Sequence, residues 1–207
     1  MRSAAAVSLA LLLLLGSPSC ATRRENRGVE VAGLDRKLST FAFIEDGDLG
    51  SFIVDTRSSR NREEGSYLPL EICVANRRLK QISLTRESFT LVDQEGNRYP
   101  CAGPKELIEG YPFLDMDRSL AELGEIVVNK FATFTPYPSK FSPTRQFSTR
   151  GIGSSLVHDS VNLPKFGFMI DFIYFPRPKT GVLNQRFELF MQAPELPDPV
   201  FVKFMVL

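Results

Sequence analysis

The chain has 207 residues, with 25 Lys or Arg against 24 Asp or Glu, so its formal net charge at pH 7 is only +1. This balance argues against a nucleic-acid-binding protein, which needs a net basic face. The aromatic residues are 17 Phe and 5 Tyr with no Trp. Phe suits the core of a β-sandwich because its ring carries no polar atom that needs a partner.

The first twenty residues have the layout of a secretory signal. Arg2 is followed by an apolar stretch over residues 7–15, then by small residues and by Cys20. The apolar stretch is too short for a transmembrane helix, which needs about 20 residues. We therefore expect export, with cleavage near the small residues.

The position of Cys20 resembles a bacterial lipoprotein signal, in which cleavage comes directly before a lipidated cysteine. The resemblance implies that residues 1–19 are removed and that lipid on Cys20 anchors the protein to a membrane, facing the periplasm or the exterior. We expect residues 20–28 to form a tether, because residues 22–28 are polar and charged. The alternative is an ordinary secreted protein cut near Ser19 or Ala21, with Cys20 incidental.

Alternating apolar residues predict strands at 38–44, 51–56 and 67–76. Residues 57–66 contain no apolar side chain and predict a mobile loop. The next connection, residues 77–80, contains Arg77, Arg78 and Lys80 and is either a solubilising turn or a contact for lipid headgroups. A hairpin is expected at 89–99, because Gly96 lies in its turn.

A Pro-rich insertion is expected at about 102–162. Residues 104–109 predict a short helix that starts at Pro104 and stops at Gly110. A second helix is predicted after Ser119, which with Glu122 forms a capping-box pattern. Six aromatic residues lie among the loop residues of this insertion and either pack onto the core or anchor a partner. They are Tyr111, Phe113, Phe134, Tyr137, Phe141 and Phe147, and the contacts predicted for an envelope protein partner are Tyr111, Phe113, Tyr137 and Phe141.

The last third of the chain returns to strands, at 161–163, 167–175, 186–192 and 199–207. Eight or nine short strands with turns between them are typical of a sandwich. We predict a mainly β protein, an immunoglobulin-like antiparallel β-sandwich over residues 29–207, in which the insertion contains one or two short helices.

One phrase of the sequence carries a family resemblance. The hairpin reads Phe89-x-Leu91-x-Asp93-x-x-Gly96-x-x-Tyr99, and it follows an apolar strand that ends in Asn76. This pattern resembles the immunoglobulin-like, telokin-like sandwich modules of uncharacterised bacterial lipoproteins, over about half of the mature chain. The resemblance implies a fold and a cell-envelope location, and it carries over no catalytic residue.

The sequence contains few candidates for catalytic or metal-binding residues. His158 is the only histidine, and no nucleophile elbow, P-loop or dinucleotide fingerprint is present. One histidine and two further cysteines make a zinc site unexpected, and no cofactor is predicted. Cys73 and Cys101 either form a disulfide, which export permits, or remain two separate thiols.

Three functions follow from these observations. The first is a non-enzymatic, membrane-anchored binding or structural module of the cell envelope. The second is a carrier of an apolar ligand between the two sheets, which requires a cavity of some hundreds of Å³. The third is a hydrolase that uses His158, which requires a Ser or Cys side chain within hydrogen-bond reach of the imidazole.

Overall fold

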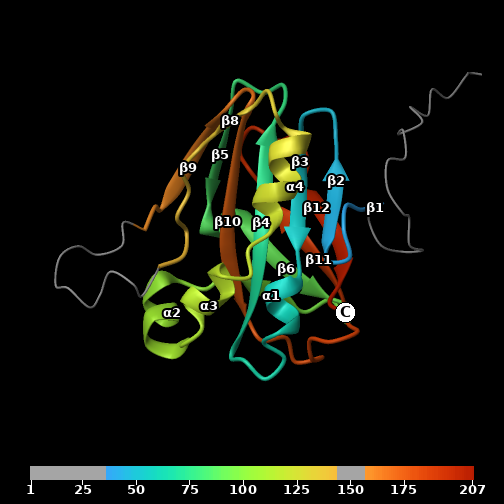
Figure 1. The fold of residues 1–207 in the computed structure, drawn as a ribbon, viewed down its shortest axis with the longest axis vertical. Coiled ribbons are helices and arrows are strands. Elements are labelled where there is room, and N and C mark those ends of the chain that lie inside the picture. Colours follow the sequence, from blue (N-terminus) through green and yellow to red (C-terminus); the bar gives the residue numbers. More distant parts are fainter. Residues whose placement is uncertain (1–35, 144–156) are drawn as a thin grey trace, which may run out of the picture.

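A computed structural model describes residues 36–143 and 157–207 (Figure 1). The expected signal and tether, with Cys20, lie outside these residues, as does Phe147 of the insertion. The larger sheet has six strands, in the spatial order β1 (Arg36–Lys37), β2 (Ala42–Asp46), β3 (Gly50–Asp55), β4 (Tyr67–Asn76), β10 (Gly167–Pro176) and β8 (Thr135–Pro136). All of its neighbours are antiparallel except β10 and β8.

A four-stranded antiparallel sheet forms the second layer. Its order is β12 (Val200–Met205), β11 (Arg186–Met191), β6 (Phe89–Asp93) and β7 (Arg98–Pro100). A separate antiparallel pair consists of β5 (Gln81–Thr85), which precedes the predicted insertion, and β9 (Ser160–Pro164), at the end of the insertion. A 3₁₀ turn, η1 (Arg86–Ser88), leads from β5 into β6.

Four short helices form a third layer on the outer face of the six-stranded sheet. They are α1 (Arg57–Arg60), α2 (Pro104–Gly110), α3 (Leu114–Arg118) and α4 (Leu123–Lys130). In Figure 1, α1 and α4 lie in front of this sheet, and β6, β11 and β12 lie behind it. Helices therefore cover one face of the six-stranded sheet, and the four-stranded sheet covers the other.

Strand β4 shows why the sheet is buried on both faces. Successive side chains of a strand point to opposite faces, and Leu68, Leu70, Ile72 and Val74 enter the core between the two sheets. Cys73 and Ala75 point the other way and pack with α4. The core between the sheets also holds fully buried Phe rings, namely Phe43, Phe52, Phe89, Phe187 and Phe204.

The structure confirms the prediction of a mainly β sandwich with few short helices. The helix predicted at 104–109 is α2, with Pro104 in its first turn. The described part of the insertion contains three helices rather than one or two. It also contributes strands to two sheets, because β8 pairs with β10 and β9 pairs with β5.

The prediction of a mobile loop at 57–66 is wrong in its first half. Residues 57–60 form α1, and Ser58 and Ser59 are buried despite their polarity. Their hydroxyl groups donate to main-chain carbonyls of distant residues, Ser58 to Asp117 and Ser59 to Pro69. A buried hydroxyl needs such a partner, and the local sequence could not show that these partners exist.

Candidate functional site

A pocket of about 220 Å³ lies between the two sheets at the end of the sandwich where β4 stops and β5 starts. Its floor consists of the buried apolar side chains of Val74, Ile82, Met191 and Leu196. These residues come from β4, β5, β11 and the connection after β11. The pocket therefore forms only when both sheets and the β5–β9 pair assemble.

The rim of this pocket is acidic. Glu45, Asp48 and Asp198 line it, and Asp48 and Asp198 are exposed. Asp48 lies in the tight turn between β2 and β3, which the hydrogen bond from the Gly47 N–H to the Gly50 carbonyl closes at 3.0 Å. Asp198 lies between Pro197 and Pro199, in a connection that cannot continue a strand ladder because proline has no N–H group.

The lining limits the chemistry of the pocket. It contains no His, Cys, Lys or Arg, and its one hydroxyl side chain, that of Ser51, donates to Asp46 at 2.5 Å. The Asp46 carboxylate is also paired with Arg77 and Lys130, which makes it a weak general base for activating this hydroxyl as a nucleophile. An apolar floor under a negatively charged rim fits a small apolar molecule that carries a positive charge.

A second group of titratable residues lies between the six-stranded sheet and the helices. Glu71 is 3% exposed and accepts hydrogen bonds from the main-chain N–H groups of Glu122 and Leu123, at 2.9 and 3.1 Å. Burial raises the pKa of Glu71 to about 7, and the nearby carboxylate of Asp55 also raises it. Asp55 is the direct cross-strand neighbour of Glu71.

Asp117 is the other buried carboxylate of this layer. It accepts a hydrogen bond of 2.6 Å from the Tyr111 hydroxyl and forms an ion pair of 2.8 Å with Arg62. Burial raises the pKa of Asp117 to about 6. Neither Asp117 nor Glu71 lines the pocket. Glu71 joins α4 to the six-stranded sheet, and Asp117 joins α3 to Tyr111 and to Arg62, in the segment after α1. We interpret these groups as structural, since ion-pair networks perturb pKa values as active sites do.

The aromatic residues predicted to contact a partner divide into two groups. Tyr111 and Phe141 are buried, and their rings pack against Tyr174 and Phe89. Phe113 and Tyr137 are half-buried and pack against the same apolar clusters. Tyr111 and Phe141 therefore pack onto the core, and their buried rings are not available to a partner.

Cys73 and Cys101 are free thiols, so the disulfide alternative is not formed in this structure. The physical reason is their placement. Cys73 is buried between the sheet and α4, whereas Cys101 packs against the core between the two sheets. In this structure Cys73 and Cys101 are therefore two separate thiols.

His158 contacts its surroundings through its main chain. Its N–H donates to the Lys140 carbonyl at 2.8 Å, and its own carbonyl accepts from Arg86 at 2.9 Å. Within the described residues no Ser or Cys side chain hydrogen-bonds the imidazole, and His158 does not line the pocket. The part of the chain that the structure describes also holds no group of three His, Cys, Asp or Glu residues arranged to bind a metal ion.

The pocket residues were not singled out in the sequence. Residues 45–50 and 193–198 have the Gly-rich and Pro-rich composition of ordinary turns. The one usable signal was an acidic residue in each turn, Asp48 and Asp198. Nothing local shows that these two turns meet, because they are 150 residues apart in the chain.

No family model, curated protein or solved structure matches this chain. The likeness to immunoglobulin-like modules of bacterial lipoproteins therefore stays a prediction. Among the described residues, no helix is both long enough and apolar enough to cross a membrane.

Proposed function

We propose that this protein is an exported lipoprotein anchored to a bacterial membrane through Cys20, and that its sandwich is a non-enzymatic module that binds a small apolar cation. The pocket between the sheets is the observation that supports the binding function. The order of basic, apolar and small residues before Cys20 supports the anchor. The hydrolase alternative gains no support, because His158 has no nucleophile beside it among the described residues.

The size of the pocket limits its ligand. An apolar cavity of about 150 Å³ is known to hold benzene, and this pocket has about 220 Å³. A single substituted ring or a short branched alkyl group fits that volume, whereas a full acyl chain does not. The core behind the pocket is filled by Phe side chains, so a longer ligand would extend outward past the rim.

The charges at the rim select among ligands of that size. Asp48 and Asp198 are exposed, so their attraction for a cation is modest and screened by salt. Their main effect is on selectivity, because an anionic ligand would meet like charges on entry. We therefore expect binding to follow the order cation, neutral molecule, anion for ligands of one shape.

Isothermal titration calorimetry with three benzyl compounds tests this order. Benzyltrimethylammonium should bind more tightly than benzyl alcohol, and benzylsulfonate should not bind measurably. The double variant Asp48→Asn with Asp198→Asn should bind the first two compounds with similar affinity. Equal affinity of the unchanged protein for the cation and the anion would contradict the proposal.

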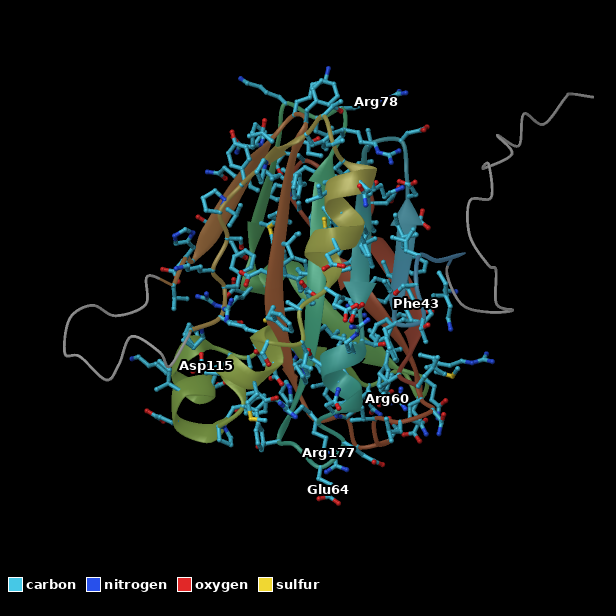
Figure 2. The ribbon with its side chains drawn as sticks, viewed as in Figure 1. Phe43, Arg60, Glu64, Arg78, Asp115 and Arg177 are labelled. Atoms are coloured by element: carbon cyan, nitrogen blue, oxygen red, sulfur yellow. The ribbon has the colours of Figure 1, made fainter. Side chains whose placement is uncertain are left out.

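Two further variants control this experiment. Ile82→Phe fills the floor of the pocket and should abolish binding of all three compounds, with circular dichroism confirming that the protein is folded. Glu64→Gln removes an exposed carboxylate at the opposite end of the domain from Arg78 (Figure 2) and should leave every affinity unchanged. The anchor is tested separately by mass spectrometry of the mature N-terminus, which should be acylated at Cys20; an unmodified terminus would remove the membrane part of the proposal.

A further inference from the structure

Two loops form one exposed tip at the end of the sandwich, beside the pocket. The N–H of Phe166, in the turn between β9 and β10, donates to the Asn76 carbonyl at 2.8 Å. The N–H of Lys165 donates to the Lys80 carbonyl at 3.3 Å. The connection after β4 and the turn before β10 are therefore hydrogen-bonded to each other. We call Arg78, Lys80, Lys165 and Phe166 the cationic tip.

Asn76 holds this tip together from below. Its side chain is fully buried, and its amide donates to the carbonyls of Leu79 and Leu163, both at 3.0 Å. Its amide oxygen accepts from the Leu79 N–H, also at 3.0 Å. The position of one loop relative to the other is thus determined by a buried amide, and the tip is preorganised rather than assembled from free loops.

Phe166 is unusual for its position. Its side chain is 50% exposed, and its φ of 59° lies in the left-handed region that Gly or Asn adopts with least strain. Its ring packs edge-on against Phe134, at 5.6 Å between centroids, and lies 5.0 Å from the Lys165 amine. Neither the backbone nor the core requires an aromatic residue there. Strain kept at an exposed site is a reason to look for a function.

The cations of the tip form no ion pairs within the described residues. Arg78, Lys80 and Lys165 are exposed, and none of them pairs with a carboxylate of the described residues. The nearby cations Arg77 and Lys130 differ, because both pair with Asp46, at 2.5 and 3.0 Å. Three free cations around one exposed ring complement a negatively charged surface that has an apolar interior.

We propose that the cationic tip docks on the headgroup region of an anionic phospholipid bilayer, with Phe166 inserted at the interface. Lys and Arg side chains near such a surface each strengthen binding roughly fivefold, and aromatic side chains partition into the headgroup level. This inference concerns the orientation of the domain on the membrane and does not depend on the pocket or on its ligand.

The start of the domain is compatible with this orientation. Arg36 begins β1 opposite Ile44, and β2 runs from there to Asp46, which pairs with Arg77 next to the tip. The described chain therefore begins on the side of β1 that faces the tip. Residues 21–35 separate it from Cys20, a length that spans at most about 50 Å. An anchored domain docks intramolecularly, so a weak contact is sufficient.

Tryptophan fluorescence tests the docking directly, because the chain contains no Trp. The purified mature protein with Phe166→Trp is mixed with vesicles of phosphatidylcholine, alone or with an equal part of phosphatidylglycerol. We expect emission to shift to the blue, and to be quenched by brominated lipid, on the anionic vesicles. The shift should be reversed in 1 M salt, where the Debye length is about 3 Å.

Matched variants separate docking from other effects. Met116→Trp places the reporter at another exposed apolar position, on α3, and should show no shift. In the Phe166→Trp background, Arg78→Glu with Lys165→Glu should weaken binding by at least tenfold. Arg60→Glu with Arg177→Glu, at positions far from Arg78 in Figure 2, should leave it unchanged. Phe166→Asn should lose vesicle binding without lower thermal stability, because Asn tolerates the left-handed conformation.

Three results would overturn the inference. They are an absent shift at Phe166→Trp, an equal shift at Met116→Trp, and binding that the charge reversal does not weaken. Tight binding of polyglutamate with no response to vesicles would instead identify the tip as a contact for an acidic protein. Repeating the titration with Cys20→Ser distinguishes this inference from the anchor. This variant has no acylation site, and it should still dock, although at a higher lipid concentration.

Discussion

Glu71, in the middle of β4, accepts the main-chain N–H of Leu123, the first residue of α4, at 3.1 Å. Its carboxylate also accepts the N–H of Glu122 at 2.9 Å. One side chain of the sheet therefore satisfies two of the N–H groups that a helix start leaves without intrahelical partners. This arrangement attaches α4 to the sheet. Because Glu71 is buried there, its charged form is disfavoured.

The first prediction concerns the pH dependence of this contact. Burial raises the pKa of Glu71 from 4.5 to about 7, so the folded protein binds this proton more tightly than the unfolded chain does. The resulting stabilisation is fully present below about pH 4.5 and is lost as pH rises through about 7. As the pH rises from 5 to 8, the stability of Glu71→Gln relative to the unchanged protein should increase by roughly 2.5 kcal/mol.

Urea unfolding at pH 5 and pH 8 measures this difference. Glu64→Gln, which removes an exposed carboxylate, should show the same stability as the unchanged protein at both values. A free-energy difference between Glu71→Gln and the unchanged protein that is constant across this range would show that Glu71 does not titrate there.

The second prediction concerns the buried amide of Asn76. Asn76→Ala leaves the Leu163 carbonyl and both main-chain groups of Leu79 without their side-chain partner. Each buried polar group left unpaired costs about 1–3 kcal/mol, and we expect a total loss of about 3 kcal/mol or more in chemical denaturation. Asn129→Ala, an exposed change on α4, is the matched control and should alter stability by less than about 0.5 kcal/mol.

The third prediction compares two glycines. A Cβ atom at Gly50 would lie 2.5 Å from the main-chain oxygen of Ala75, and only a shift of β3 away from β4 would relieve that contact. A Cβ atom at Gly124, in α4, meets nothing within 4 Å. Gly50→Ala should lower the free energy of unfolding by about 1–3 kcal/mol, and Gly124→Ala should raise it by up to about 1 kcal/mol. Opposite signs in thermal denaturation are the expected result; a loss at both positions would argue against the placement of α4.

The fourth prediction concerns the two thiols. Because Cys73 and Cys101 are unbonded, a reducing agent should leave the thermal midpoint unchanged. Burial raises the pKa of Cys101 to about 12 and raises that of Cys73 further, so iodoacetamide should modify neither thiol quickly at pH 8. Alkylation in denaturant without reductant, followed by mass spectrometry, should modify both; a mass two units lower with no label would reveal a disulfide.

Much of the fold could be predicted from local patterns. The alternation around Leu70 and Ile72 defines β4, and the apolar run that ends at Pro176 defines β10, because side-chain period and proline act within a few residues. The start of α2 at Pro104 follows from the same kind of local rule. The predicted capping box at Ser119 and Glu122 did not form, because Ser119 ends α3 with its hydroxyl donating to the Met116 carbonyl, and α4 starts only at Leu123.

The pocket and the cationic tip show what local patterns could not determine. Asp48 and Asp198 share a rim only because the two sheets end together, and Lys165 lies beside Lys80 only because Asn76 joins their loops. The sequence by itself determined which segments are strands and that an apolar core exists, since both depend on neighbours in the chain. Only the tertiary structure decided which turns meet and which polar side chains are buried, because each of these contacts joins residues that are far apart in the sequence.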